Sequence, residues 1–176
     1  MRYLQNEHII LRAPEIKDIE HVYRWENDSS LWFLGNSIEP ISHYTVKNYI
    51  ERCTQTTIAE SRQLKLIIEY NQKVTGCLDL YEIDFLNKKA EIGILIDPEY
   101  QKQHIATQAI NLVSEYAFKF LDLQQIYAYI AENNTASIQL FEKLNFQKSG
   151  TLRHWIKKDG EFINVSIYQK LRPNQL

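Results

Sequence analysis

A short polar loop, residues 101–104 (QKQH), separates two apolar stretches and carries residue types suited to hold an anion. The stretch before it, 90–97, predicts a strand, and residues 103–120 repeat apolar side chains at helical spacing. The first amides of a helix have no partner within the helix, and its dipole favours an anion there. The loop is therefore a candidate phosphate site, although it contains no glycine and most strand–helix loops bind no ligand.

The remaining elements show how this loop would be positioned. Strands are expected at 8–13, 64–71, 74–84, 90–97 and 124–132 and in a final hairpin at 152–171, and helices at 13–28, 42–60, 103–120 and 134–145. Residues 90–132 form a strand–helix–strand crossover between parallel strands, whereas the other strands are antiparallel. We expect one domain, residues 1–176, of mixed α/β (α+β) class with a mostly antiparallel sheet flanked by helices. The apolar strand 90–97 is expected to be buried on both faces.

Composition excludes several classes of protein. The chain has 176 residues and a formal net charge of −2, so no overall field draws it to nucleic acid or to anionic lipid. Its cysteines, Cys53 and Cys77, lie far apart and have no metal-ligand spacing, which favours packing roles in a reduced protein. No apolar run approaches membrane-spanning length, and the first residues do not read as a signal peptide. The sequence therefore predicts a cytoplasmic protein without a metal requirement.

The loop and a later segment, NNTASIQLFEKLNF (133–146), together resemble the GNAT superfamily of N-acetyltransferases. Gln101 and Ala106 match the loop of that family, and Asn134 and Ser137 match its later motif. The resemblance implies the family fold, with acetyl-CoA as co-substrate between two splayed parallel strands. The residues that would bind acetyl-CoA are Ile94, Leu95, Ile96, Gln101, Lys102, Gln103, His104, Ile105, Ala106, Thr107, Asn134 and Ser137.

His104 stands where the family has glycine. Histidine visits the left-handed backbone region more readily than most residues, so it can hold a glycine-like turn at modest strain. Its ring can also become charged and pair with a phosphate. The alternative is an ordinary backbone conformation with the side chain in solvent. The sequence leaves both open.

The implied reaction is attack of a neutral amine on the acetyl thioester, so the site must remove a proton from an alkylammonium. The family uses a tyrosine to help the thiolate leave, and Phe141 replaces that tyrosine here. Ser137 is the candidate proton relay, although serine near a helix start is commonly only a backbone partner. Glu82 is a further candidate catalytic residue, and the sequence does not identify the general base. A thiolate leaves fairly easily, so the replacement predicts a slowed enzyme rather than an inactive one.

The strand and turn at 77–91 resemble bacterial spermidine/spermine N-acetyltransferases. The resemblance implies that Glu39, Glu82 and Glu91 face a polyamine acceptor, with Asp84 compensating for a carboxylate missing before Pro40. Spaced carboxylates suit a polycation, although acidic residues at strand ends are usually only solvated.

The N-terminal half equally resembles the enzymes that acetylate the N-terminal alanine of ribosomal proteins, which makes a peptide N-terminus the alternative acceptor. A non-catalytic acyl-CoA-binding module is the alternative from another class. Homo-oligomerisation is left open by the sequence.

Overall fold

The strands that the structure describes form one sheet with the order β1-β2-β3-β4-β5-β7-β6. The structure is a computed structural model that describes residues 3–29, 32 and 39–173. Every neighbouring pair is antiparallel except β4 and β5, as the sequence predicted. The strands are β1 (Ile9–Arg12), β2 (Leu64–Tyr70), β3 (Lys73–Asp84), β4 (Lys89–Ile96), β5 (Gln125–Ala131), β6 (Gln147–Lys158) and β7 (Glu161–Leu171).

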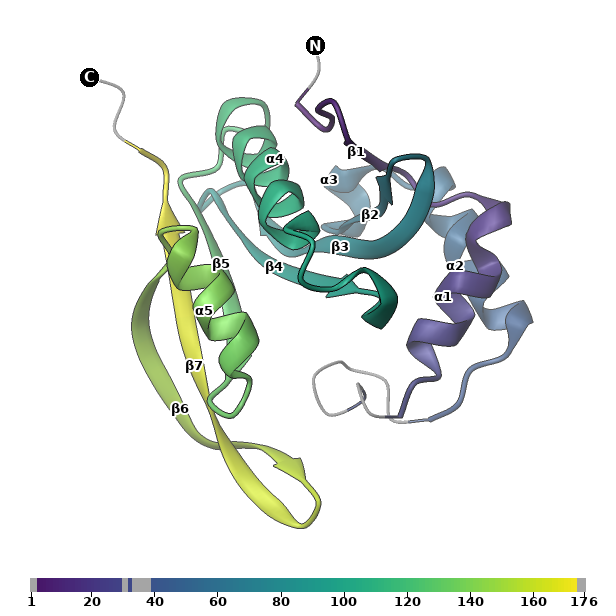
Figure 1. Cartoon of the computed structure of the whole chain (residues 1–176). Coiled ribbons are helices and arrows are strands. Elements are labelled where there is room, and N and C mark those ends of the chain that lie inside the picture. Colours follow the sequence, from purple (N-terminus) through teal and green to yellow (C-terminus); the bar gives the residue numbers. More distant parts are fainter. Residues whose placement is uncertain (1–2, 30–31, 33–38, 174–176) are drawn as a thin grey trace.

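Helices cover both faces of the sheet (Figure 1). The helical elements are η1 (Ile16–Asp18), α1 (Ile19–Glu26), α2 (His43–Gln55), α3 (Ile58–Ser61), η2 (Pro98–Tyr100), α4 (Ile105–Lys119) and α5 (Thr135–Lys143). The predicted helix 13–28 is shorter because it begins at Ile16 with a 3-10 turn. The predicted helix 42–60 is interrupted after Gln55, since the Thr57 side chain caps a separate turn.

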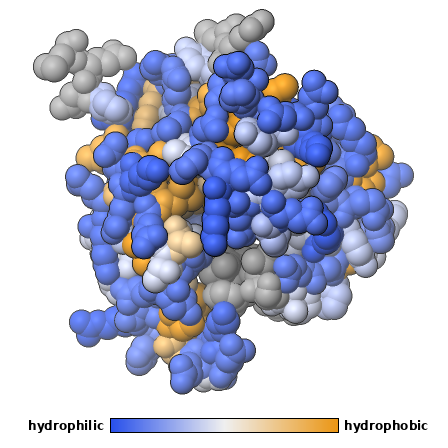
Figure 2. Space-filling model, in the orientation of Figure 1, coloured by the Kyte–Doolittle hydropathy of each residue, from blue (hydrophilic) through white to orange (hydrophobic). Residues whose placement is uncertain are grey.

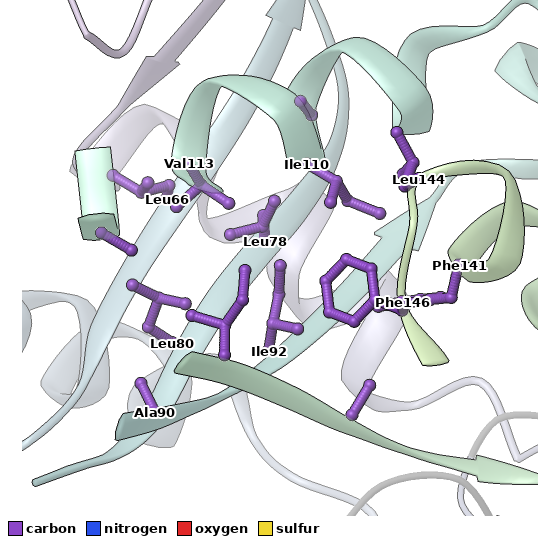
Figure 3. Close-up of a cluster of buried hydrophobic side chains, with 14 of the residues drawn as sticks. Leu66, Leu78, Leu80, Ala90, Ile92, Ile110, Val113, Phe141, Leu144 and Phe146 are labelled. Atoms are coloured by element: carbon purple, nitrogen blue, oxygen red, sulfur yellow. The ribbon is translucent and has the colours of Figure 1, made fainter. Parts of the chain in front are cut away.

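Two hydrophobic clusters follow from the alternation of side chains along β2, β3 and β4. On one face Leu78, Leu80 and Ile92 pack under α4, with Ile110 and Val113 from that helix (Figure 3). On the other face, Ile67 and Cys77 pack under α1 and α2. The sheet face under α1 and α2 also carries polar side chains, so it is the less completely apolar of the two.

The parallel pair β4–β5 is short and then opens. Backbone pairing runs only from Lys89 to Glu91 on β4, while β4 keeps its pairing with β3 up to Ile96. From Ile92 onward β4 therefore has one unpaired edge. The prediction that this strand is buried on both faces is wrong: Ala90 and Ile92 are buried, and the residues between and after them are half-buried.

The final hairpin, β6–β7, extends away from the body of the molecule (Figure 1). Its turn is Asp159-Gly160, as predicted, with φ of 50° and 88°. Figure 2 shows a mostly hydrophilic face with small hydrophobic patches, one of them on this hairpin. Among the described helices, none is long and apolar enough to cross a membrane.

The absence of a side chain at Gly76 lets the backbones of β3 and β4 pair at this position. A Cβ at position 76 would sit 2.1 Å from the carbonyl oxygen of Leu95 on the neighbouring strand, whereas one at Gly150 would meet nothing within 4 Å. We expect Gly76→Ala to lower the free energy of unfolding by about 3 kcal/mol, because backbone cannot retreat as a side chain can. Gly150→Ala, the matched control, should change it by less than about 0.5 kcal/mol. Urea denaturation of both variants tests this, and equal losses would contradict it.

Candidate active site

The open edge of β4 leads directly into the start of α4. Ile94, Leu95 and Ile96 are half-buried along this edge, and the chain then passes through η2 to the first residue of α4, Ile105. Within the described residues, the amides of positions 105–107 donate to no acceptor. The site therefore combines unpaired strand groups with unpaired helix amides, a suitable cradle for a ligand with amide and phosphate groups.

The loop before α4 is built with left-handed backbone at two residues. His104 caps the helix with φ 60° and ψ 13°, and Lys102 has φ 61°. His104 thus takes the conformation that glycine would take, and the alternative of an ordinary conformation is wrong. The side chains of Gln101 and Gln103 donate to the carbonyl oxygens of Ile96 and Glu99, at 3.2 and 3.3 Å. They brace the loop, while Lys102 and His104 stay exposed.

Asn134 and Ser137 lie together at the start of α5. The Asn134 side chain caps the helix by accepting a hydrogen bond of 3.1 Å from the Ser137 amide. Within the described part of the chain, the Asn134 NH₂ and the Ser137 hydroxyl have no protein partner, so both can still meet a ligand. Phe141 belongs to the same predicted motif, but its side chain is buried in the core. Its ring centroid lies 4.8 Å from that of Phe146 (Figure 3).

A β-bulge in β3 places Glu82. The register with β4 shifts between Tyr81 and Asp84, and Glu82 has φ 44°. Strict alternation would turn Glu82 into the core beside Leu80. The bulge lets Ile83 fill that core position instead, which frees Glu82 for the opposite face.

Glu82, Glu91 and Tyr127 form an acidic cluster on the face under α1 and α2. Glu91 pairs with Tyr127 across β4 and β5 at the last pair before the strands separate. Burial raises the pKa of Glu91, and the charge of Glu82 raises it further. Burial, with the charge of Glu91 and the nearby Tyr129, raises the pKa of Tyr127 to about 12. Two carboxylates that have no ion-pair partner within the described residues thus lie beside a phenol that stays protonated.

The other two predicted acidic residues differ from these. Asp84 accepts hydrogen bonds from the backbone of Leu86 and Asn87 and from the Asn87 side chain, at 2.7 to 3.0 Å. Its main contribution is to close the turn into β4. Glu39 is exposed, and no interaction within the described residues joins it to the acidic cluster.

The sequence reasoning missed Asp97, which ties the end of β4 to α1. Its carboxylate accepts from the Trp25 indole at 3.3 Å and pairs with Arg24. Its amide donates to the Thr75 carbonyl at 2.9 Å. An aspartate between an apolar strand and a proline was the available signal, but nothing in the sequence identifies α1 as its partner.

Comparison with known proteins agrees with this arrangement. The family model described as "Acetyltransferase (GNAT) domain" matches residues 8–147. The spermidine N(1)-acetyltransferase of Escherichia coli is 28% identical over 88% of this chain and 81% of its own length. A putative ribosomal N-acetyltransferase of Bacillus subtilis is also 28% identical, over 95% and 93%.

Solved structures show the same fold. The crystal structure of spermidine N-acetyltransferase from Vibrio cholerae in complex with CoA and spermine has a TM-score of 0.82 at 25% identity, covering 94% of this chain and 96% of that one. The same Vibrio protein is known as a dodecamer. Since the family model spans most of the chain and the folds superpose over nearly all of it, this protein belongs to the GNAT family and is an N-acetyltransferase.

Proposed function

We propose that this protein transfers the acetyl group of acetyl-CoA to a primary amine of a polyamine such as spermidine or spermine. The observation that carries the proposal is the acidic cluster of Glu82, Glu91 and Tyr127 beside the opening between β4 and β5. An aliphatic polycation needs carboxylates that have no fixed cation partner. The likeness to spermidine acetyltransferases supports the same acceptor. By the same likeness, we include assembly into a homo-oligomer.

The residues around the opening fit acetyl-CoA. The free edge of Ile94–Ile96 can pair with the amides of the pantetheine arm, as a neighbouring strand would. The amides of 105–107 and the Lys102 side chain can hold the pyrophosphate. Asn134 adds an NH₂ donor at the start of α5, the helix that follows β5 in the chain.

Glu91 and Glu82 are the proposed groups for the acceptor amine. The amine arrives protonated and must lose its proton before it attacks the thioester. Glu91 is half-buried and its raised pKa makes it a better proton acceptor than an ordinary glutamate. Once one carboxylate accepts a proton, the other still holds the remaining positive charge of the polyamine.

The site offers fewer groups to protonate the departing thiolate than to deprotonate the amine. Phe141 has no proton to donate and lies in the core, so Ser137 and a water molecule are the proposed sources of the proton. A thiol of pKa about 8.5 is a good leaving group, so this weakness slows the reaction without stopping it.

A peptide N-terminus is the second candidate acceptor. The equal identity to a putative ribosomal N-acetyltransferase favours it. A peptide N-terminus carries one ammonium, however, and has less need of paired carboxylates than a polyamine does.

We expect free-thiol release from acetyl-CoA with spermidine and spermine, and little with lysine or an alanine-initiated peptide. Glu91→Gln should lower kcat/KM for spermidine about 100-fold, because it removes the proton acceptor. The matched control is Glu7→Gln, at an exposed carboxylate before β1, which should leave kcat/KM for spermidine unchanged. Thiol release with the peptide alone would identify a protein N-terminus, and not a polyamine, as the acceptor.

Glu91 must be ionised to act, so kcat/KM should fall as pH drops through its raised pKa. Glu82→Gln removes the neighbouring negative charge that raises this pKa, so the acidic limb of the profile should move to lower pH even though the plateau decreases. A full pH profile of wild type and variant measures this. An acidic limb that stays in place would exclude Glu91 as the titrating group.

Because the backbone of His104 is left-handed, His104→Gly should keep the loop and bind acetyl-CoA at least as tightly as the wild type. His104→Val should bind roughly 10-fold more weakly, since a β-branched residue resists this conformation. Titration calorimetry with CoA measures both. Weaker binding by His104→Gly would instead show that the imidazole itself contacts the phosphates.

A further inference from the structure

A cavity of about 250 Å³ lies between α1, α2 and the strands β2 and β3. Its polar lining consists of Glu26, Thr45, Tyr49, Gln63, Lys65 and Tyr81. The cavity is on the same sheet face as the acidic cluster, and the proposed transfer chemistry uses none of these residues.

Lys65 places an ammonium group inside this cavity. Its Nζ is 3.0 Å from Asp79 Oδ2 and 4.0 Å from Glu26 Oε1, and its side chain is only 5% exposed. The same Nζ lies 5.6 Å from the ring centroid of Tyr49. Two carboxylates and an aromatic face are the surroundings in which proteins bind alkylammonium ions. Lys65 is thus an alkylammonium ion supplied by the chain itself.

The second oxygen of Asp79 is also engaged. Gln63 donates to Asp79 Oδ1 at 3.3 Å and to the Tyr49 hydroxyl at 3.0 Å. Glu26 in the cavity wall and Asp79 behind it are therefore already organised around a cation. Stability alone does not require this arrangement, because buried ion pairs are often replaceable by apolar residues at no cost.

The cavity borders the strand that carries Glu91. Lys65, Asp79 and Gly93 are direct neighbours across β2, β3 and β4, and the next row on this face pairs Tyr81 with Glu91. The Tyr81 ring lines the cavity and also covers Gly93, where an added Cβ would meet it at 3.0 Å. From strand spacing, the backbones of Lys65 and Glu91 are about 12 Å apart. An extended triamine spans a comparable length.

We propose that Lys65 is a specificity-determining residue that occupies a cation site under α1 and α2 from within the chain. An acceptor whose reacting amine lies at Glu91 finds this second site filled. Its other ammonium groups are directed instead toward Glu82, which follows the Tyr81–Glu91 row on β3, on the side of Glu91 away from Lys65. This rests on the proposed function for its consequence in catalysis, although the cation site itself can be tested without any reaction.

Removal of the built-in cation tests the site directly. Lys65→Ala leaves Asp79 buried without its ion partner, so Tm should fall. Propylammonium, which replaces the deleted part of the side chain, should raise the Tm of Lys65→Ala by roughly 3–5 °C more than that of the wild type. Propanol, a neutral analogue, should not raise the Tm of Lys65→Ala more than that of the wild type. The double variant Lys65→Met/Asp79→Leu is the matched control, and equal shifts in all proteins would overturn the proposal.

Steady-state kinetics test the effect on specificity. The ratio of kcat/KM for spermidine to that for propylamine should rise about 10-fold in Lys65→Ala, because a second ammonium gains a site, and should be unchanged in Lys65→Met/Asp79→Leu. Glu26→Gln tests the same cavity with Lys65 in place and should leave the ratio unchanged. A lower ratio in Glu26→Gln would show that the acceptor enters the cavity despite Lys65, which overturns the proposal. If wild type acetylates no amine, the proposed function fails while the Tm test stands.

Discussion

The separation of β4 from β5 is the constraint on which the candidate site depends. The two strands pair over three residues and then diverge because each is held by a different partner. β4 follows β3 up to Ile96, and Asp97 fastens its end to α1 through Arg24 and Trp25. β5 follows β7 along its whole length. A continuous parallel ladder would satisfy more backbone groups, so the opening persists only because these partners hold the strands apart.

The divergence also separates the proposed acetyl-CoA site from the proposed acceptor site. The proposed acetyl-CoA cradle is made of backbone groups, on β4 and at the start of α4, and tolerates changes of side chain. The proposed acceptor site is made of side chains on the face under α1 and α2. Among the carboxylates on that face, Asp79 and the pair Glu82 and Glu91 differ in their partners. Asp79 is paired with Lys65, whereas Glu82 and Glu91 have no ion-pair partner within the described residues and are the carboxylates proposed to hold the acceptor. The chain thus distinguishes two acidic sites that share one surface.

Local patterns in the sequence were sufficient for what depends on neighbours along the chain. The crossover between 90 and 132, the turn at Asp159-Gly160 and the tolerance of His104 for a left-handed backbone are of this kind. Features that depend on cross-strand packing were missed. The bulge at Glu82 shows only as a shift of the apolar alternation from Leu80 to Ile83. The buried state of Phe141 depends on Phe146, which the sequence motif did not identify as its packing partner.

Phe141 fills a core position that suits phenylalanine better than tyrosine. Its ring completes the core under α4 and α5, with an edge-to-face contact to Phe146. A tyrosine hydroxyl in that apolar position would need a partner to offset its burial. The thiolate is the easier of the two groups to accommodate, because its pKa lies close to neutrality, whereas the ammonium must lose a proton held about three pKa units more tightly than the surrounding pH favours. Within the proposed site, the raised pKa values of Glu91 and Tyr127 lie on the side of the ammonium, where the harder proton transfer is needed.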